Sequence, residues 1–400
     1  MAWTVVLFPF SGFPRALALK WQTAPRFFIF QYKPPNGELS WQKDTLYTMK
    51  KSFLSLVLTL CLFAGSAIAQ SSMLATLSHE GEISVFYGAN ALKEAHTAAA
   101  HGDVITLSSG SFNATDITKA ITLRGAGVET NTSRNIYPTI ITGDFSIALS
   151  DSVKQNLTIE GIFNNFTVTI KNGLDNATFI KDRFKTLTYS GSTSSFKNNR
   201  FIHCKIVETL TAVSNSRNNS LSFMNCYIGT LLNNDCPTIL HNSIMDTNRG
   251  VFTLSNQKYC TFYNCIIIAG KNVNGDIFNA SNNLYNCITT NLASNNANNK
   301  DINYYSYKNI TSNSNHTIQN IDGVFKTFRV NGYNEEETFE LLDDVKTKYL
   351  GTDGTQIGIH GGSYPYSSIT TNPQITKCIV APRSTADGKL SIDIEVKAGE

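Results

Sequence analysis

The sequence predicts an all-β solenoid in which short strands stack coil upon coil, and two features of the chain predict it. A motif spaced by 17–22 residues returns seven times between residues 157 and 289. Upstream of it, residues 91–100 have the pattern of a short amphipathic helix. Stacked strands leave an open end that invites aggregation, and we expect this helix to cover that end.

The repeat is clearest where "FMNCYI" (223–228), "FYNCII" (262–267) and "LYNCIT" (284–289) share an Asn-Cys pair. Aligned on the residue after the Asn, seven copies form one column: Glu160, Asp182, Cys204, Cys226, Ser243, Cys265 and Cys287. A large apolar residue stands three positions earlier, beginning with Leu157, and a further column begins two positions later with Ile162. Short strands in repeats of this length predict solenoid coils, and the frame of leucine-rich repeats is absent.

Each copy is expected to bend at one residue. Side chains of a strand alternate between inward and outward, and in the copy at 223–228 the alternation breaks at Asn225. Asn tolerates the left-handed backbone conformation better than other residues with a side chain. We expect the Asn side chains of successive copies to hydrogen-bond one another in a ladder. The Cys residues would fill the corner as small buried apolar groups.

The chain's opening, "ALKEAHTAAAHGDVITLSSGSF" (91–112), predicts a helix followed by a strand. Its apolar residues recur with helical spacing from Ala91 to Ala99. The "HGD" stretch ends the helix, "VITL" (104–107) begins a strand, and "AITLRGAG" (120–127) supplies the next strand and turn.

The bend motif and this opening resemble the right-handed parallel β-helix, or pectate-lyase-like, superfamily over residues 85–345. The resemblance implies a right-handed parallel β-helix with an N-terminal cap over 70–345. Residues 351–366 resemble the glycine-rich ending of such proteins. Residues 346–400 are therefore expected to form a closing segment and a β appendage that is too short to be an independent domain.

The N-terminal part of the chain predicts export. A short basic stretch (49–51), an apolar run (53–65) too short to span a bilayer and a small-x-small site ending at Ala69 form a signal peptide over 49–69. We expect cleavage after Ala69 and a periplasmic, cell-surface or secreted protein. Residues 1–48 are interpreted as an extension from an over-extended start; the alternative is a real N-terminal extension with an internal anchor helix.

Composition narrows the partners. Residues 1–69 hold seven of the 33 basic and two of the 30 acidic side chains, so the exported part has a formal net charge of −2. It has no basic stripe, which argues against a nucleic-acid partner, and no apolar run long enough to cross a membrane. A polysaccharide or a cell-surface glycan is the expected partner, and the oligomeric state is open.

The resemblance raises the question of catalysis, because related β-helix enzymes cleave acidic polysaccharides. Elimination needs a base, commonly Arg or Lys, often with Ca²⁺; hydrolysis needs paired carboxylates. Residues 182–276 contain no Asp-Asp pair, and the Arg-rich pattern of pectate lyases is missing. No cofactor is predicted, and Ca²⁺ is expected only if the protein is a lyase.

Three residues are catalytic candidates: Glu160 and Asp182, which fall in the otherwise small column, and the neighbouring Arg183. Buried acids would be costly and would mark a functional site. The alternative is that the early coils bend at Gly161, which leaves both acids at an exposed corner, with Asp182 in a surface ion pair with Lys181 and Arg183.

Sugar binding is the other class of function, and exposed aromatic side chains are its usual mark. Tyr227, Tyr263 and Tyr285 fall on outward-facing or bend-adjacent positions of the repeat and are the binding candidates. Tyr is also a common strand residue, so a purely structural role is the alternative. We expect the cysteines to be reduced and buried, with Cys236 and Cys260 the best-placed pair if a disulfide forms.

Three functions follow from these observations. The favoured one is a non-catalytic glycan-binding or adhesive protein, because the centre of the repeat is poor in charge. The second is a polysaccharide lyase or glycoside hydrolase with an atypical site. The third is a structural module of a surface assembly.

Overall fold

The computed structural model describes residues 73–130, 132, 137–150, 155–191, 195–212, 219–232, 236–246, 259–269, 282–291, 314–318, 321–328, 333–370, 374–380, 383 and 388–397. The predicted signal peptide, its cleavage site and the upstream extension lie outside the described residues.

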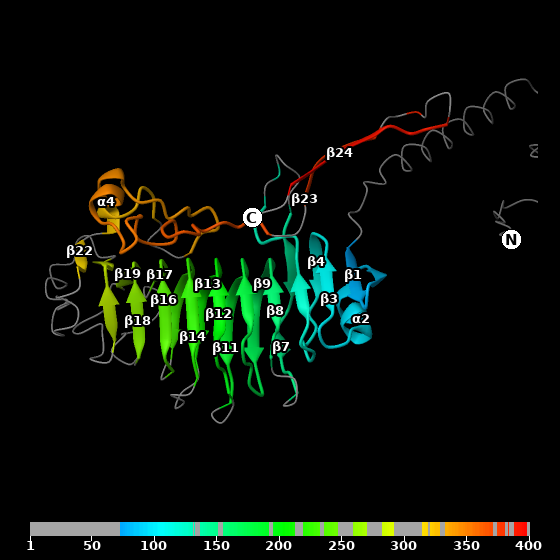
Figure 1. The fold of residues 1–400 in the computed structure, drawn as a ribbon, viewed down its shortest axis with the longest axis horizontal. Coiled ribbons are helices and arrows are strands. Elements are labelled where there is room, and N and C mark those ends of the chain that lie inside the picture. Colours follow the sequence, from blue (N-terminus) through cyan, green and yellow to red (C-terminus); the bar gives the residue numbers. More distant parts are fainter. Residues whose placement is uncertain are drawn as a thin grey trace, which may run out of the picture. The chain divides into compact units, whose positions relative to one another are not determined.

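Two eleven-stranded sheets form a right-handed parallel β-solenoid (Figure 1). In sheet B, ten of the strands follow one another and β7 pairs at the side. Sheet A consists, in spatial order, of β2 (Glu82–Tyr87), β1 (Leu74–His79), β3 (Val104–Leu107), β5 (Thr122–Arg124), β8 (Thr158–Glu160), β10 (Thr178–Ile180), β12 (Asn199–Ile202), β14 (Leu221–Met224), β16 (Thr238–His241), β18 (Cys260–Tyr263) and β20 (Asn283–Tyr285). Sheet B consists of β22 (His316–Ile318), β21 (Ile288–Asn291), β19 (Ile266–Ala269), β17 (Ile244–Asp246), β15 (Tyr227–Leu232), β13 (Lys205–Thr211), β11 (Arg183–Tyr189), β9 (Ile162–Ile170), β6 (Thr139–Thr142) and β4 (Gly110–Asn113), with β7 (Phe145–Ile147) also paired to β9. From β8 to β21 the chain alternates between the sheets, so each pair of strands belongs to one coil.

The N-terminal end of the solenoid has the predicted cap. Helix α2 (Ala91–Ala98) buries Leu92 and Ala95 in the core. Its C-terminal carbonyl groups are bound by the Lys119 ammonium group, which donates to the carbonyl oxygens of His96, Thr97 and Ala99 at 2.6–2.9 Å. The predicted helix and the strands that follow it are confirmed.

One residue with a left-handed backbone conformation joins sheet A to sheet B in each repeated coil. These corner residues, with φ between 47° and 68°, are Gly161, Lys181, His203, Asn225, Asn242, Asn264 and Asn286. The predicted bend at Asn225 is therefore confirmed. The backbone N–H of Asn225 donates to the carbonyl of His241 in the next coil, which extends the sheet ladder into the corner. The chain thus passes from β14 to β15 across two residues, Asn225 and Cys226.

The residue after a corner points inward, and at Asp182, Cys226 and Ser243 its side chain accepts a backbone N–H. The N–H of Cys204 donates to the Cys226 Sγ at 3.3 Å, and the N–H of Cys226 donates to the Ser243 Oγ at 3.1 Å. The column is therefore more than a small apolar filler, because it satisfies N–H groups that the corner turns away from the ladder. The six cysteines between residues 204 and 287 are buried thiols, and none of them, Cys236 and Cys260 included, is in a disulfide, so reduced thiols are confirmed for these positions.

The register of the first copy differs from the prediction by two residues. Phe179 pairs with Ile159, and Ile180 pairs with Glu160. The first corner is Gly161, so the spacing to the corner at Lys181 is 20 residues rather than 22. Glu160 consequently lies before the corner and does not belong to the inward column, and Leu157 is not the counterpart of Phe179.

Apolar side chains fill two layers. Between the sheets, Phe179, Phe201 and Phe223 stack at centroid distances of 4.7 Å as part of the main core. A second core lies outside sheet B, where Ile244, Ile266 and Ile288 pack beneath residues 321–328 and 333–359. This covering part includes the short helices η4 (Ile321–Gly323) and α4 (Asp343–Lys348).

We call residues 333–370 the C-terminal strap, which follows the solenoid back along its coils (orange in Figure 1). The strap is hydrogen-bonded to one corner after another: Thr352 to Asn264, Ile359 and Gly361 to Asn225, Tyr364 to His203, and Ile369 to Lys181. The predicted ladder between Asn side chains is therefore wrong at Asn225 and Asn264. These side chains project outward from the corner and donate to the strap instead.

The chain continues beyond the strap into an antiparallel pair of strands, β23 (Gln374–Val380) and β24 (Ile392–Lys397). Ile379, Ile392, Ile394 and Val396 are each more than half exposed there. This pair is the predicted C-terminal β appendage.

We predict that Asn225→Ala destabilises the protein more than Asn225→Gly. Both variants lose two hydrogen bonds to the strap, which costs about 1–3 kcal/mol. Ala also forces a Cβ into the left-handed conformation, which adds about 1–2 kcal/mol. Urea denaturation measures both free energies of unfolding, and equal values would show that the corner conformation does not constrain the fold.

Candidate functional site

The three predicted catalytic residues lie in three different environments. Glu160 is on the outer side of sheet A, with an oxygen 3.6 Å from the Arg124 Nε. Asp182 points inward and Arg183 points outward from sheet B, as adjacent residues of a strand must. These residues are close in sequence, but their side chains do not point to one place in the structure.

Asp182 is part of the core. Its side chain is 1% exposed, its Oδ1 accepts the N–H of Ile162 at 2.8 Å, and its Oδ2 has no partner in the described part of the chain. Burial, followed by the neighbouring Cys204, raises the pKa of this carboxyl group well above its usual value. Asp182 therefore occupies the inward acceptor column as a group that favours the neutral form.

The expected exposed corner and surface ion pair are both wrong. Glu160 and Asp182 are 2% and 1% exposed. Lys181, at the corner itself, donates to the Ile369 carbonyl of the strap, and Arg183 pairs with Glu335. The strap covers this corner, and this long-range contact is why a local ion pair does not form.

Arg183 and Lys205 form a basic cluster on the outer face of sheet B. They are direct neighbours on β11 and β13, and both are less than a tenth exposed. Arg183 contacts Glu335 and the Asn165 Oδ1, and the Lys205 Nζ lies 3.6 Å from the Glu129 Oε1. Burial lowers the pKa of Lys205.

Aromatic rings line this cluster. The Arg183 guanidinium lies 4.4 Å from the centre of the Phe163 ring, and the Lys205 Nζ lies 5.1 Å from the centre of the Tyr366 ring. Tyr333 is 5.9 Å from both cations. Burial and the nearby Glu335 raise the pKa of Tyr333, so its hydroxyl group stays protonated.

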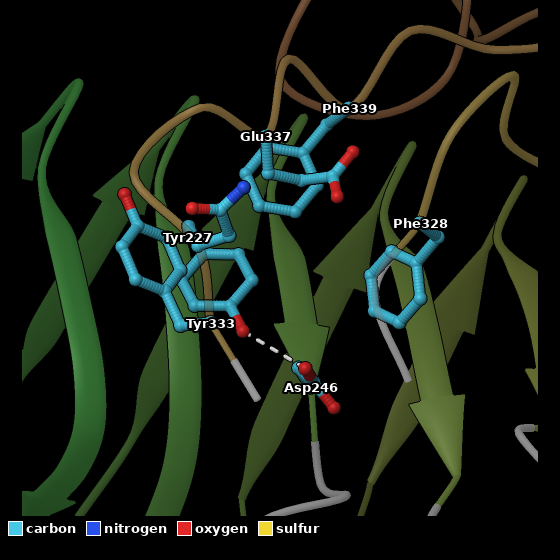
Figure 2. Close-up of a pocket in the computed structure, with 7 residues that line it drawn as sticks. Tyr227, Asp246, Phe328, Tyr333, Glu337 and Phe339 are labelled. Atoms are coloured by element: carbon cyan, nitrogen blue, oxygen red, sulfur yellow. Dashed lines mark hydrogen bonds between the residues drawn. The ribbon is translucent and has the colours of Figure 1, made fainter. Parts of the chain in front are cut away.

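A small cavity adjoins the basic cluster between sheet B and the covering residues (Figure 2). Tyr227 and Asp246 form its floor, with the Tyr227 hydroxyl donating to the Asp246 Oδ2 at 2.8 Å, and Tyr333, Glu337 and Phe339 lie over it. Its volume of about 10 Å³ is about the space that one buried water needs. A sugar ring does not fit this cavity.

The three predicted binding tyrosines do not share a face. Tyr227 follows a corner and is 1% exposed on sheet B, packed against Tyr333 and Phe339. Tyr227 faces outward from sheet B, but the strap removes it from solvent. Tyr263 and Tyr285 precede their corners and lie on sheet A.

We call His241, Tyr263 and Tyr285 the aromatic strip of sheet A. Their rings stack at centroid distances of 4.8 and 4.9 Å, with interplanar angles of 8° and 12°. His241 is exposed and both tyrosines are half-buried. Because each ring covers its neighbour's face, the strip presents ring edges and polar atoms to solvent rather than a flat stacking platform.

Within the described ranges, no three His, Cys, Asp or Glu side chains gather in a way that could hold a metal ion. No helix among the described residues has the length and apolar character needed to cross a membrane.

No protein-family model, curated protein or solved structure matches the chain. The structure shows a parallel β-solenoid, and the relationship to the pectate-lyase-like superfamily stays an expectation from the resemblance.

Sequence reasoning missed the basic cluster. One feature of the sequence indicates the cluster: Arg183 and Lys205 stand one position after the aligned column in consecutive copies. That position faces outward on sheet B. Their partners Glu129, Tyr333 and Glu335 are far away in the sequence. No local pattern connects them to the repeat.

We predict that Asp182→Asn stabilises the protein at neutral pH by about 1–3 kcal/mol. Within the part of the chain that the structure describes, the Asp182 Oδ2 is a buried polar atom without a partner, which costs about this much, and the substitution removes it. Asn315 has the same role in the last coil, where its Oδ1 accepts the Cys287 N–H and its amide donates to the Leu284 carbonyl. The folded-state pKa of Asp182 is raised above its unfolded value of about 3.9. Its contribution is therefore fully present below that unfolded value and is lost as the pH rises towards the folded pKa.

Thermal unfolding of both proteins across pH 3–8, a range that brackets about 3.9, measures this difference. As the pH falls, the wild type should gain stability relative to the variant, because only the wild type has a carboxyl group at position 182 that becomes protonated. A wild-type advantage at neutral pH would contradict a buried neutral carboxyl.

Proposed function

We propose that the protein is a non-catalytic glycan-binding or adhesive solenoid of the cell exterior, and that the aromatic strip of sheet A is its binding surface. One observation carries the proposal. The strip lies on a sheet face that solvent reaches, whereas Arg183 and Lys205 on sheet B are buried and paired with Glu335 and Glu129.

The neighbours of the strip support recognition of a glycan. Met224 and Ile239, on adjacent strands of sheet A, are 39% and 42% exposed. The strip therefore combines apolar patches with phenolic and imidazole groups, as sugars with apolar faces and hydroxyl edges require. Because the rings present their edges, we expect hydrogen bonds to sugar hydroxyls to contribute more than ring stacking.

Export rests on the predicted signal peptide over 49–69, and a cell-surface, periplasmic or secreted location is part of the proposal. The diverging side chains of Glu160, Asp182 and Arg183 support the absence of catalysis, since acid–base chemistry needs groups within reach of one reacting bond.

A second candidate function is a polysaccharide lyase. Lys205 favours it, because burial lowers the pKa of this amine, as is required of a general base near neutral pH. Its place beside Arg183 and Tyr333 would then matter for catalysis. The enclosed position of this cluster favours the non-catalytic function.

We predict that the purified protein is retarded in affinity gels by at least one member of a panel of neutral and acidic polysaccharides. Replacing Tyr263 and Tyr285 together by Ala should weaken retention by about tenfold in Kd, because two contact residues are lost. Tyr364→Ala is the matched control, since Tyr364 is 71% exposed but lies on the strap.

The same samples are assayed for unsaturated products and reducing ends. Product that disappears in Lys205→Met would establish the lyase and exclude the non-catalytic function. Retention that is equally weak in the control and in the double variant would exclude the strip as the binding surface.

A further inference from the structure

The basic cluster has a feature that a purely structural ion pair does not need. Arg183 and Lys205 are like charges on neighbouring strands, which lie about 4.8 Å apart. Both are almost fully buried, at 6% and 4% exposure. Two adjacent buried cations are costly unless anions compensate them. The cluster therefore requires negative charge in front of it.

The carboxylates that supply this charge sit at the edge of the cluster. Glu335 belongs to the strap and Glu129 follows β5, and their side chains are 50% and 46% exposed. Both can reach water when they leave the cations, whereas Arg183 and Lys205 cannot. The two buried cations are held in place on sheet strands, whereas the two glutamates can move away and be replaced by another anion.

The two glutamates also leave donors unused. Among the residues that the structure describes, the buried Arg183 Nε has no hydrogen-bond partner, and neither has the Tyr366 hydroxyl group. The Lys205 Nζ is 3.6 Å from the nearest Glu129 oxygen, longer than the 2.7–2.9 Å or so of a charge-assisted hydrogen bond. A group with several anionic oxygens could accept from these donors together.

The surroundings would strengthen such binding. Phe163, Tyr333 and Tyr366 line the cations and keep water away. Electrostatic attraction is stronger in a water-excluded site. A guanidinium group beside an ammonium group suits an oxyanion, because Arg binds two oxygens in its plane and Lys adds a point charge.

We propose that Arg183 and Lys205 form a binding site for an oxyanion, a carboxylate or sulfate group of a ligand, and that Glu335 of the strap occupies this site as an internal competitor. The ligand displaces Glu335 into solvent and gains the donors that the glutamates leave unused. The site is separate from the aromatic strip and does not depend on it.

The test is calorimetric titration of the full-length protein with sodium sulfate, at constant ionic strength kept with sodium chloride. Glu335→Gln should lower the Kd for sulfate about tenfold relative to the wild type, because the internal competitor is weakened. Glu340→Gln is the matched control: Glu340 is on the same strap but pairs with the exposed Lys326. It should leave the Kd unchanged.

Lys205→Met in the Glu335→Gln background should abolish sulfate binding, and thermal melts establish that each variant is folded. If Lys205→Met is unfolded, Arg183→Lys is used, which keeps the charge and removes the bidentate geometry, and is expected to weaken binding. Equal affinities in the Glu335 and Glu340 variants would overturn the proposal, as would sulfate binding that survives the changes at Lys205 and Arg183. Loss of glycan retention in the aromatic-strip variants would leave this result unaffected.

Discussion

The left-handed corner between the two sheets is the constraint on which the rest of the structure depends. It turns the chain from sheet A to sheet B, and it has three consequences in the coils from Lys181 to Asn264. The backbone N–H stays in the ladder, the next residue points inward, and the corner side chain points outward. Asp182, Cys226 and Ser243 of the inward column thus accept backbone N–H groups, and Lys181, His203, Asn225 and Asn264 of the outward column bind the strap.

The outward corner column makes the two sheet faces different. Because Asn225, His203 and Lys181 all bind backbone carbonyls of the strap, the strap follows the corners and covers the part of sheet B next to them, including Tyr227. Sheet A has no such cover over His241 and Met224, which are exposed. The asymmetry explains why tyrosines on either side of a corner have different surroundings: Tyr227 is enclosed, and Tyr263 is accessible.

Local patterns sufficed for the repeat itself. The phase break at Asn225, the inward phenylalanines and the helical cap could all be predicted, because each depends on neighbours within one coil. The sequence alignment of the first coil was wrong because the corner at Gly161 shortens its spacing to 20 residues, and the apolar columns do not show this shortening. The strap could not be predicted, since its contacts join residues such as Asn225 and Ile359, 134 positions apart. Hence the burial of Tyr227 and the basic cluster also escaped prediction.

Hydroxyl-radical footprinting tests most directly whether the strap encloses sheet B and leaves sheet A accessible. Comparing tyrosines with one another removes differences in chemical reactivity. The account predicts rapid oxidation of Tyr364, which is 71% exposed, intermediate oxidation of Tyr263, and far slower oxidation of Tyr227, which is 1% exposed. Oxidation of Tyr227 as fast as that of Tyr263 would contradict it, because sheet B would then be as open as sheet A.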